Sequence, residues 1–356
     1  MNTSAHEKPG VPPGFRIDTH DRRAIAQLDE ELARKREPRG RNWAIILAAG
    51  DGSRLRRLTT DGSGASIPKQ FCSLRNGPSL LHEALLRAES LAPRRRICAV
   101  VASRHVRWWR ESLSSLPVAN VLVQPENRGT ALGILLALLH ILERDDLARV
   151  LVLPSDHHVS NEPALSVAMA QAVVRVRKEP AGIVLLGMTP EEPDPELGYI
   201  VPALGAPDRF ASVARFVEKP TVAEARTLIV RGALWNSFIV AAHARSLLGA
   251  IARHDPELVE RMRAAVKRSR TQREPALAGL YPSLPTVDFS RQILQGREPL
   301  FRVLRVPACG WTDLGTVERV GKSLRGGVGR VAAGGAPLAA GAALSLERQL
   351  AHFGSA

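Results

Sequence analysis

Short runs of apolar residues recur along this chain, and each stops at a glycine, a proline or a polar residue. The runs cover 44–49, 97–102, 121–123, 150–153 and 182–187. Runs of this length, apolar at nearly every position, are typical of strands buried on both faces. Between them, apolar residues fall at helical spacing in 80–88, 129–143 and 163–177, and Ser79 stands where the first of these helices would be capped. This alternation predicts βαβ units and an α/β fold with a mainly parallel sheet.

The pattern changes after residue 190. Apolar segments at 199–201, 213–217 and 235–240 follow one another at shorter spacing, with turns between them. We interpret them as a mixed sheet lying over the first half of the fold. Further helices are expected at 243–253, 256–267, 288–295 and 316–324, with a late strand at 300–306.

The two ends of the chain differ in composition from the part between them. Residues 1–40 are polar and proline-rich at first and then charged, which predicts a mobile leader. Residues 326–343 are rich in glycine and alanine, so we expect 326–356 to be a loose, low-complexity tail. The single folded domain is therefore predicted to span 41–325.

Charge and cysteine usage narrow the class of protein. The formal net charge of +14 suits anionic partners such as nucleic acid, a membrane surface or phosphorylated small molecules. The three cysteines are widely spaced and form no CxxC motif, as is typical of a protein in a reducing cytoplasm. The longest nearly apolar run, 131–142, is too short to cross a bilayer, and the first 41 residues lack a secretory signal. We expect a cytoplasmic protein with no membrane partner.

Nucleic acid is the alternative partner that the charge leaves open. Most of the excess arginine is scattered, and 94–96 is the only tight cluster within the predicted domain. Trp108 and Trp109 could stack on bases, but neighbouring tryptophans on a helix more often cover the edge of a core or a contact between subunits. We therefore expect no nucleic-acid partner, while a homo-oligomer remains possible.

Two glycines and two cations follow the first predicted strand. Gly50 and Gly52 allow backbone N–H groups to approach a phosphate closely, and Arg54 and Lys69 add fixed positive charge. Neither a dinucleotide-binding GxGxxG nor a P-loop is present. The pattern favours a polyphosphate site at the carboxyl end of the sheet, and the alternative is an ordinary glycine turn.

Two aspartates follow two other predicted strands. Asp156 comes after the strand at 150–153, and Asp313 comes after the strand at 300–306. Mg²⁺ in proteins is commonly bound by one or two carboxylates together with phosphate oxygens, so this pair predicts a magnesium site. The alternative is that each aspartate merely caps the turn or helix that follows it.

Further polar residues at strand ends suit a base and a sugar. Gln124 offers both a donor and an acceptor to a base edge, and Gly129 lets a base lie against the backbone, although both also fit a plain strand-to-helix loop. Glu218 suits sugar hydroxyls and Lys219 suits a phosphate, although such a pair is more often a solvated surface. Gly198 and Asn236 are further candidates for contact with a sugar.

In their order along the chain these segments resemble the sugar-phosphate nucleotidyltransferases, and most closely the mannose-1-phosphate guanylyltransferases. The resemblance covers 43 to about 320 and rests on eight segments: LAAGDGSRL (47–55), PKQF (68–71), QPENRGTA (124–131), LPSDH (153–157), LGYI (197–200), FVEKP (216–220), WNSF (235–238) and WTDLGT (311–316). The chain departs from the family in reading WNSF where mannose enzymes commonly read WNSGMF, and in having Gln124 where a glutamate is usual.

The resemblance implies a Rossmann-like (GT-A-type) αβα sandwich and a transfer from an NTP, with GTP favoured, to a hexose 1-phosphate, with mannose 1-phosphate favoured. It assigns the triphosphate to Gly50, Gly52, Arg54 and Lys69, the base to Gln124 and Gly129, Mg²⁺ to Asp156 and Asp313, and the sugar phosphate to Gly198, Glu218, Lys219 and Asn236. Arg54 and Lys69 are also the expected catalytic residues, because with Mg²⁺ they would neutralise charge during transfer. Alternatives within the class are another NTP or another sugar 1-phosphate. An alternative outside it is a nucleotide-sugar-binding protein without turnover.

Overall fold

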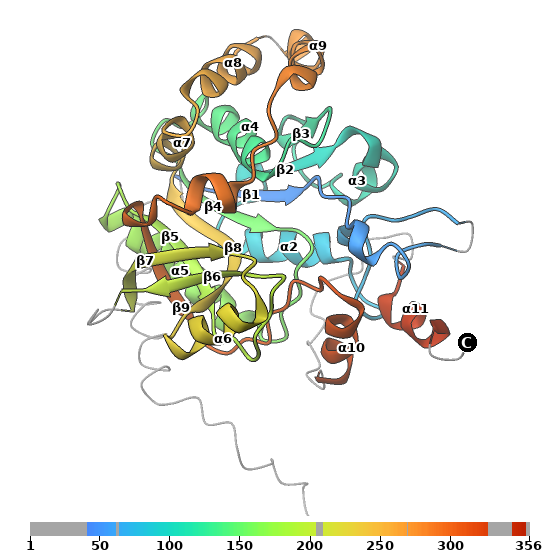
Figure 1. Cartoon of the computed structure of the whole chain (residues 1–356). Coiled ribbons are helices and arrows are strands. Elements are labelled where there is room, and N and C mark those ends of the chain that lie inside the picture. Colours follow the sequence, from blue (N-terminus) through green and yellow to red (C-terminus); the bar gives the residue numbers. More distant parts are fainter. Residues whose placement is uncertain (1–40, 62–63, 204–208, 269, 327–343, 354–356) are drawn as a thin grey trace, which may run out of the picture. The chain divides into compact units, whose positions relative to one another are not determined.

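The apolar runs nearest the N-terminus form adjacent parallel strands, as their composition predicts. The structure is a computed structural model that describes residues 41–61, 64–203, 209–268, 270–326 and 344–353 (Figure 1). Strand β1 (Asn42–Ala48) lies between β2 (Ile97–Ala102) and β4 (Arg149–Pro154), and β3 (Val121–Gln124) pairs with β2. All four run parallel, so their carboxyl ends meet at one edge of the sheet.

The later strands join this same sheet, which corrects the expectation of a second sheet over the first half. The nine strands follow the order β3-β2-β1-β4-β8-β5-β9-β7-β6, and β6 also pairs with β8. The additional strands are β5 (Ile183–Met188), β6 (Gly198–Pro202), β7 (Phe210–Glu218), β8 (Leu234–His243) and β9 (Phe301–Val306). Strand β8 runs antiparallel to both β4 and β5, so it joins the two halves edge to edge.

Helices cover both faces of the sheet, which gives the expected αβα arrangement. Side chains of β1 alternate between the faces: Trp43 and Ile45 pack in one core with α4, α7 and α8, whereas Ala44 and Ile46 pack in the other with α2, α5 and α6. The helices are α2 (Leu80–Glu89), α3 (Val106–Ser112), α4 (Thr130–Leu142), α5 (Glu162–Lys178), α6 (Val222–Val230), α7 (Ala244–Ala252), α8 (Pro256–Val266), α9 (Arg270–Leu280), α10 (Val317–Gly326) and α11 (Leu346–Phe353).

Local sequence explains where several helices begin. Ser79 caps α2 by accepting a hydrogen bond from the backbone of His82 at 3.3 Å, as predicted. Helix α6 was not predicted, although Thr221 and Glu224 carry a capping signal: the Thr221 hydroxyl accepts from the Glu224 backbone at 3.2 Å. The helix expected at 288–295 is a single π-helical segment, Phe289–Leu294.

The expectation of a loose tail over 326–356 is wrong for its described part. Residues 344–353 include helix α11, and Leu346 is fully buried against residues that follow the glycine turn. The expectation rested on the glycine- and alanine-rich composition of 326–343, and that composition does not extend to the apolar residues that follow it. Residues 327–343 and 354–356 lie outside the described residues, as does the expected leader at 1–40.

The structure shows where the three cysteines and the neighbouring tryptophans lie. The three cysteines are buried and unpaired, consistent with a packing role. Trp108 and Trp109 are partly buried against one of the two cores, and the Trp109 indole donates to the Ala102 carbonyl at 2.9 Å, so they cover a core edge. Across the described ranges, no helix is both long and apolar enough to span a bilayer.

Candidate functional site

A cavity of about 350 Å³ opens at the edge of the sheet where the parallel strands end. The antiparallel strands contribute their opposite ends to the same edge, because Gly198 at the start of β6 pairs with Glu218 at the end of β7. Of the residues predicted for the site, those on the cavity wall are Gly50, Arg54, Gln124, Gly129, Asp156, Gly198, Glu218, Lys219, Asn236 and Asp313. Gly52 and Lys69 are not on the wall, and Lys69 is buried behind Asp156.

The glycine turn is held by a side chain that the sequence analysis did not single out. Gln70 donates from its amide to the carbonyls of Ala48 and Gly50, at 3.0 and 2.9 Å. Gly52 has a φ of +59°, and a Cβ there would lie 3.0 Å from the backbone nitrogen of Lys69. Glycine is therefore required at 52 because Lys69 packs directly against the turn.

Arg54 is the cation on the open side of the turn. Its side chain is 51% exposed and forms an ion pair with Glu196 at 2.9 Å. Such an exposed pair contributes little to stability and exchanges readily for a stronger anion. The guanidinium is thus available to a phosphate that enters the cavity.

Lys69 is buried, with 5% of its surface exposed, and its ammonium faces the two predicted metal ligands. The Nζ atom lies 3.0 Å from Asp156 Oδ2 and also donates to the carbonyls of Asp313 and Leu314. Burial raises the pKa of the Asp156 carboxyl, but the charge and hydrogen bond of Lys69, together with the neighbouring His157, outweigh burial and hold that pKa below its ordinary value. Lys69 therefore keeps Asp156 charged rather than reaching into the cavity itself.

Asp313 is not the helix cap that the alternative interpretation required. Thr316 caps α10 by accepting from the Arg319 backbone at 3.3 Å. Asp313 Oδ1 instead accepts from the backbone of Gly315 at 2.9 Å and from the guanidinium of Arg319, which also contacts Asp194. Burial opposes ionisation of Asp313 too, but the neighbouring His157 and Arg319 hold the pKa of its carboxyl below the ordinary range.

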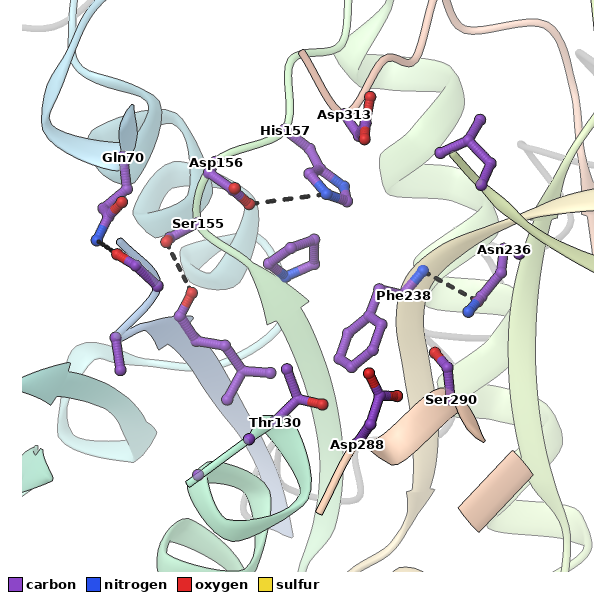
Figure 2. Close-up of a pocket in the computed structure, with 18 of the residues that line it drawn as sticks. Gln70, Thr130, Ser155, Asp156, His157, Asn236, Phe238, Asp288, Ser290 and Asp313 are labelled. Carbon is purple, nitrogen blue, oxygen red and sulfur yellow. Dashed lines mark hydrogen bonds and ion pairs between the residues drawn. The ribbon is translucent and has the colours of Figure 1, made fainter. Parts of the chain in front are cut away.

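His157 lies beside both carboxylates. Its Nε2 is 3.7 Å from Asp156 Oδ1 (Figure 2). Its ring stands edge-on to Trp311, at 5.3 Å between centroids. Burial lowers the pKa of His157 to about 4, so the imidazole is neutral at neutral pH. No cluster of three or more potential metal-binding side chains occurs among the described residues. Asp156 and Asp313 nevertheless suit Mg²⁺ arriving with a polyphosphate, because that ion needs only one or two carboxylates when phosphates supply the remaining ligands.

The predicted base side of the cavity is formed by the end of β3 and the start of α4. Gln124 is 3% exposed, and its amide donates to the Tyr281 hydroxyl at 3.1 Å. Gly129 has a φ of +84°, and a Cβ there would lie 2.3 Å from the carbonyl oxygen of Val287. The chain's own backbone therefore explains the glycine at 129. Thr130 reinforces this contact, because its hydroxyl accepts from the Phe289 backbone at 3.0 Å.

The predicted sugar side lies across the cavity, where Figure 2 shows Asn236, Phe238, Asp288 and Ser290. Asn236 accepts from the Phe238 backbone at 3.1 Å. Glu218 sits against the Gly198 backbone, since a Cβ at 198 would lie 2.6 Å from Glu218 Oε2.

Burial and then the negative charge of Asp288 raise the pKa of Glu218 to about 7, against the opposing charges of Lys219 and Arg291. Sequence analysis missed Asp288 and Ser290 because their segment was interpreted only as a helix.

Strained backbone is concentrated at this cavity. Within the described part of the chain, the non-glycine residues with positive φ are Lys219 (51°), Phe238 (59°) and Leu314 (48°). Lys219 and Phe238 line the cavity, and Leu314 follows Asp313. Such conformations are unfavourable for residues with a Cβ and tend to persist where surrounding structure enforces them for function. The backbone thus supports the assignment of this cavity as the functional site.

Comparison with known protein families matches the part of the chain that forms this cavity. A family model described as "Nucleotidyl transferase" matches residues 43–322. An alginate biosynthesis protein from Pseudomonas syringae pv. tomato is 29% identical over 281 residues, covering 76% of this chain and 56% of that protein. A mannose-1-phosphate guanylyltransferase from Escherichia coli is 30% identical over 228 residues, covering 62% and 47%. The chain spans about half the length of these relatives.

Solved structures show the same fold. The crystal structure of a mannose-1-phosphate geranyltransferase from Thermus thermophilus has a TM-score of 0.67 and 28% identity, and the match covers 79% of each chain. A mannose-6-phosphate isomerase from Helicobacter pylori has a TM-score of 0.56 at 20% identity, covering 76% of this chain and 99% of that one. At that identity the second likeness concerns the fold alone. The Rossmann-like α/β fold predicted from the sequence is confirmed.

Proposed function

Because this chain belongs to the nucleotidyl transferase family, we propose that it transfers a nucleotidyl group from GTP to mannose 1-phosphate, giving GDP-mannose and pyrophosphate. The observation that carries the proposal is a single cavity lined both by the residues expected on the nucleotide side and by those expected on the sugar side. The choice of GTP and mannose 1-phosphate is supported by relatives named mannose-1-phosphate guanylyltransferase, at about 30% identity.

The proposed reaction needs no general base. An oxygen of the sugar 1-phosphate is already anionic at neutral pH, so it attacks the α-phosphorus directly, in line with the departing pyrophosphate. One P–O bond forms, one breaks, and the bonding electrons leave with pyrophosphate. The protein therefore contributes position and electrostatic stabilisation rather than proton transfer.

Each group of side chains has a role that its surroundings support. Arg54 binds the triphosphate by exchanging its ion pair with Glu196 for phosphate oxygens. Lys219, at the end of β7, binds the phosphate of the sugar, and Asn236 binds a sugar hydroxyl. Lys69 acts from behind by keeping Asp156 ionised.

Magnesium is the ion that we propose for the two carboxylates. Asp156 and Asp313 would hold it, and the bound ion would neutralise charge on the phosphates during transfer. Both carboxylates are held in the ionised form that can bind a cation, and Mg²⁺ would share their oxygens with Lys69 and Arg319.

A nucleotide-sugar product agrees with the names of other relatives, which refer to polysaccharide biosynthesis. Alignments include alginate and xanthan biosynthesis proteins, the latter from Xanthomonas campestris at 33% identity over 220 residues, covering 61% of this chain and 45% of that protein. We propose that the nucleotide sugar made here is a donor for polysaccharide assembly.

A pyrophosphate-release assay tests the proposal. Purified protein is incubated with Mg²⁺ and each pairing from a panel of NTPs and hexose 1-phosphates. We expect the highest kcat/KM with GTP and mannose 1-phosphate. Faster release with another pair would support nucleotidyl transfer but assign other substrates. No release from folded protein with any pair would refute the proposed enzymatic activity.

A further inference from the structure

A small apolar cluster, separate from the two main cores, lies beneath the nucleotide side of the cavity. We call it the loop cluster; its buried members are Leu55, Leu58, Cys72, Leu74, Leu80, Leu314, Val320 and Leu346. Three of these residues are neighbours of proposed site residues: Leu55 follows Arg54, Leu314 follows Asp313, and Cys72 lies three positions after Lys69. One cluster therefore anchors three segments that bring cations and a carboxylate to the site.

The C-terminal segment 344–353 completes this cluster. Leu346 has no exposed surface, and Leu344 and Leu350 pack against the cluster from the same segment. Helix α11 also contacts α10, which follows Asp313, and Figure 1 shows the two helices beside each other. Leu346 is thus the part of the C-terminal segment that lies deepest under the glycine turn and the Asp313 turn.

Backbone hydrogen bonds fix the segment in register. Ser73 donates to the Leu344 carbonyl at 2.9 Å and accepts from the Leu346 backbone at 2.9 Å, and Glu347 donates to the Leu74 carbonyl at 3.1 Å. Ser73 and Ser345 thereby form a parallel bridge. These bonds join 344–347 to the stretch directly after Lys69, so motion of the segment is transmitted to that stretch.

A charged contact ties the same parts together. Arg75 donates to the Glu347 carboxylate at 3.1 Å and to the carbonyl of Leu324, near the end of α10. The C-terminal segment is therefore connected both to the Lys69 side and to the Asp313 side of the site. The sugar-side residues stand on β6, β7 and β8, which belong to the main sheet and not to the loop cluster.

We propose that the C-terminal segment is a positioning element for the nucleotide side of the site and that Leu346 is its principal positioning residue. This inference rests on the proposed function, because it concerns binding of the NTP. The cluster is small, so loss of one fully buried leucine loosens a large share of its contacts. The turns bearing Arg54, Lys69 and Asp313 then lose their fixed geometry, while the sugar side keeps the support of the main sheet.

The test compares Leu346→Ala in the full chain with two matched variants. Leu346→Met preserves volume and apolar character and serves as the conservative rescue. Arg348→Ala changes an exposed residue of the same helix and controls for an effect of α11 surface charge. For each protein, KM is measured separately for GTP and for mannose 1-phosphate, and backbone hydrogen exchange is followed at 55–60, 72–74 and 234–243.

We expect Leu346→Ala to raise the KM for GTP by about tenfold or more and to leave the KM for mannose 1-phosphate within about twofold. Exchange should quicken at 55–60 and 72–74 but not in β8, and the Met and Arg348 variants should resemble the wild type. An unchanged KM for GTP, or an equal rise in both constants, would overturn the inference while the proposed function stands. Absence of turnover in the wild-type protein would overturn both this inference and the proposed function.

Discussion

At the scale of single residues, the site depends on charges that lie behind its wall. Lys69 and Arg319 each contact one of the two carboxylates proposed for Mg²⁺, of which Asp313 is buried and Asp156 is partly exposed. Both cations favour the ionised acids despite burial, so Asp156 and Asp313 remain negative across the physiological pH range. Neither cation needs to touch a phosphate to contribute to its binding.

Removal of one carboxylate should therefore affect turnover far more than folding. We expect Asp313→Asn, which keeps an acceptor for the Gly315 backbone, to lower kcat on the order of 10²–10³-fold. Asp156→Asn should do the same, and the double variant should be little worse than either one because the pair acts as a unit. Measured kcat and melting temperature for the three variants check this; near-normal kcat in Asp313→Asn would retire its role as a metal ligand.

Glu218 should make the stability of the folded protein depend on pH. Its folded-state pKa of about 7 lies above its ordinary 4.5, so the group contributes stability that is fully present below about 4.5 and lost as the pH rises through about 7. We expect Glu218→Gln to be as stable as the wild type near pH 4.5 and more stable at pH 8. Melting temperatures across this range check the sign, and a variant less stable at pH 8 would contradict the raised pKa.

The same titration should be visible in kinetics. Protonated below about pH 7, the Glu218 carboxyl can donate a hydrogen bond to the sugar, and ionised above that pH it can only accept. The KM for the sugar 1-phosphate should change with a midpoint near 7 in the wild type, while Glu218→Gln should flatten that profile. The KM for GTP provides the internal control, since Glu218 lies on the sugar side of the cavity.

At the scale of elements, the start of α4 has the most restrictive packing around the base side. Gly129 combines a φ of +84° with a contact to Val287 that leaves no room for a Cβ. We expect Gly129→Ala to lower the melting temperature and to raise the KM for NTPs, because the Val287 backbone must move and the cavity wall moves with it. Gly232→Ala is a matched control, because Gly232 has a φ of +78° but open space around it.

That comparison separates backbone strain from crowding. Both substitutions impose a positive φ on alanine, so each is expected to lower stability from that source, and the ψ of 168° at Gly129 adds to its cost. Only Gly129→Ala adds the collision with Val287, so only it should impair nucleotide binding. Equal effects of the two variants on the KM for NTPs would argue against a special role for the start of α4.

Elements that follow from local pattern were predicted well. The runs at 44–49 and 97–102 are buried strands, and Ser79 caps α2, because apolar spacing and capping are properties of neighbouring residues. Placement of β8 between β4 and β5 was not predicted, because pairing between distant strands leaves no local signal. The same reason applies to the burial of Leu346 under the glycine turn.

The site residues divide in the same way, into those that a local pattern predicts and those whose contacts it does not predict. The strand-end positions of Asp156 and Gln124 could be predicted, because parallel strands end at a common edge. The ion pair of Asp313 with Arg319 could not, since a six-residue separation spanning a turn and a helix start does not fix where a long side chain points. Asp288 was missed because a short irregular helix carries no periodicity that distinguishes its inward face.

At the scale of the whole molecule, one continuous sheet carries both sides of the site. We expect residues 41–356 to unfold in a single calorimetric transition, because β8 pairs with strands of both halves. GTP with Mg²⁺ at about 100 times its Kd should stabilise that whole unit by about 2.7 kcal/mol, shifting the single transition upward by several degrees. Two separate transitions, with only one shifted by GTP, would show that the halves unfold independently.

The central position of β8 also has a consequence for synthesis on the ribosome. Strands β1 to β4 are contiguous in the sequence and can pair as soon as they emerge, but β4 then has an uncovered edge. Its partner β8 begins about 80 residues after β4 ends, which takes roughly 4–16 s at 5–20 residues per second. During that interval the nascent chain presents an apolar parallel half-sheet with an open edge, so we expect chaperone dependence and aggregation in vivo to be greatest for chains arrested between β4 and β8.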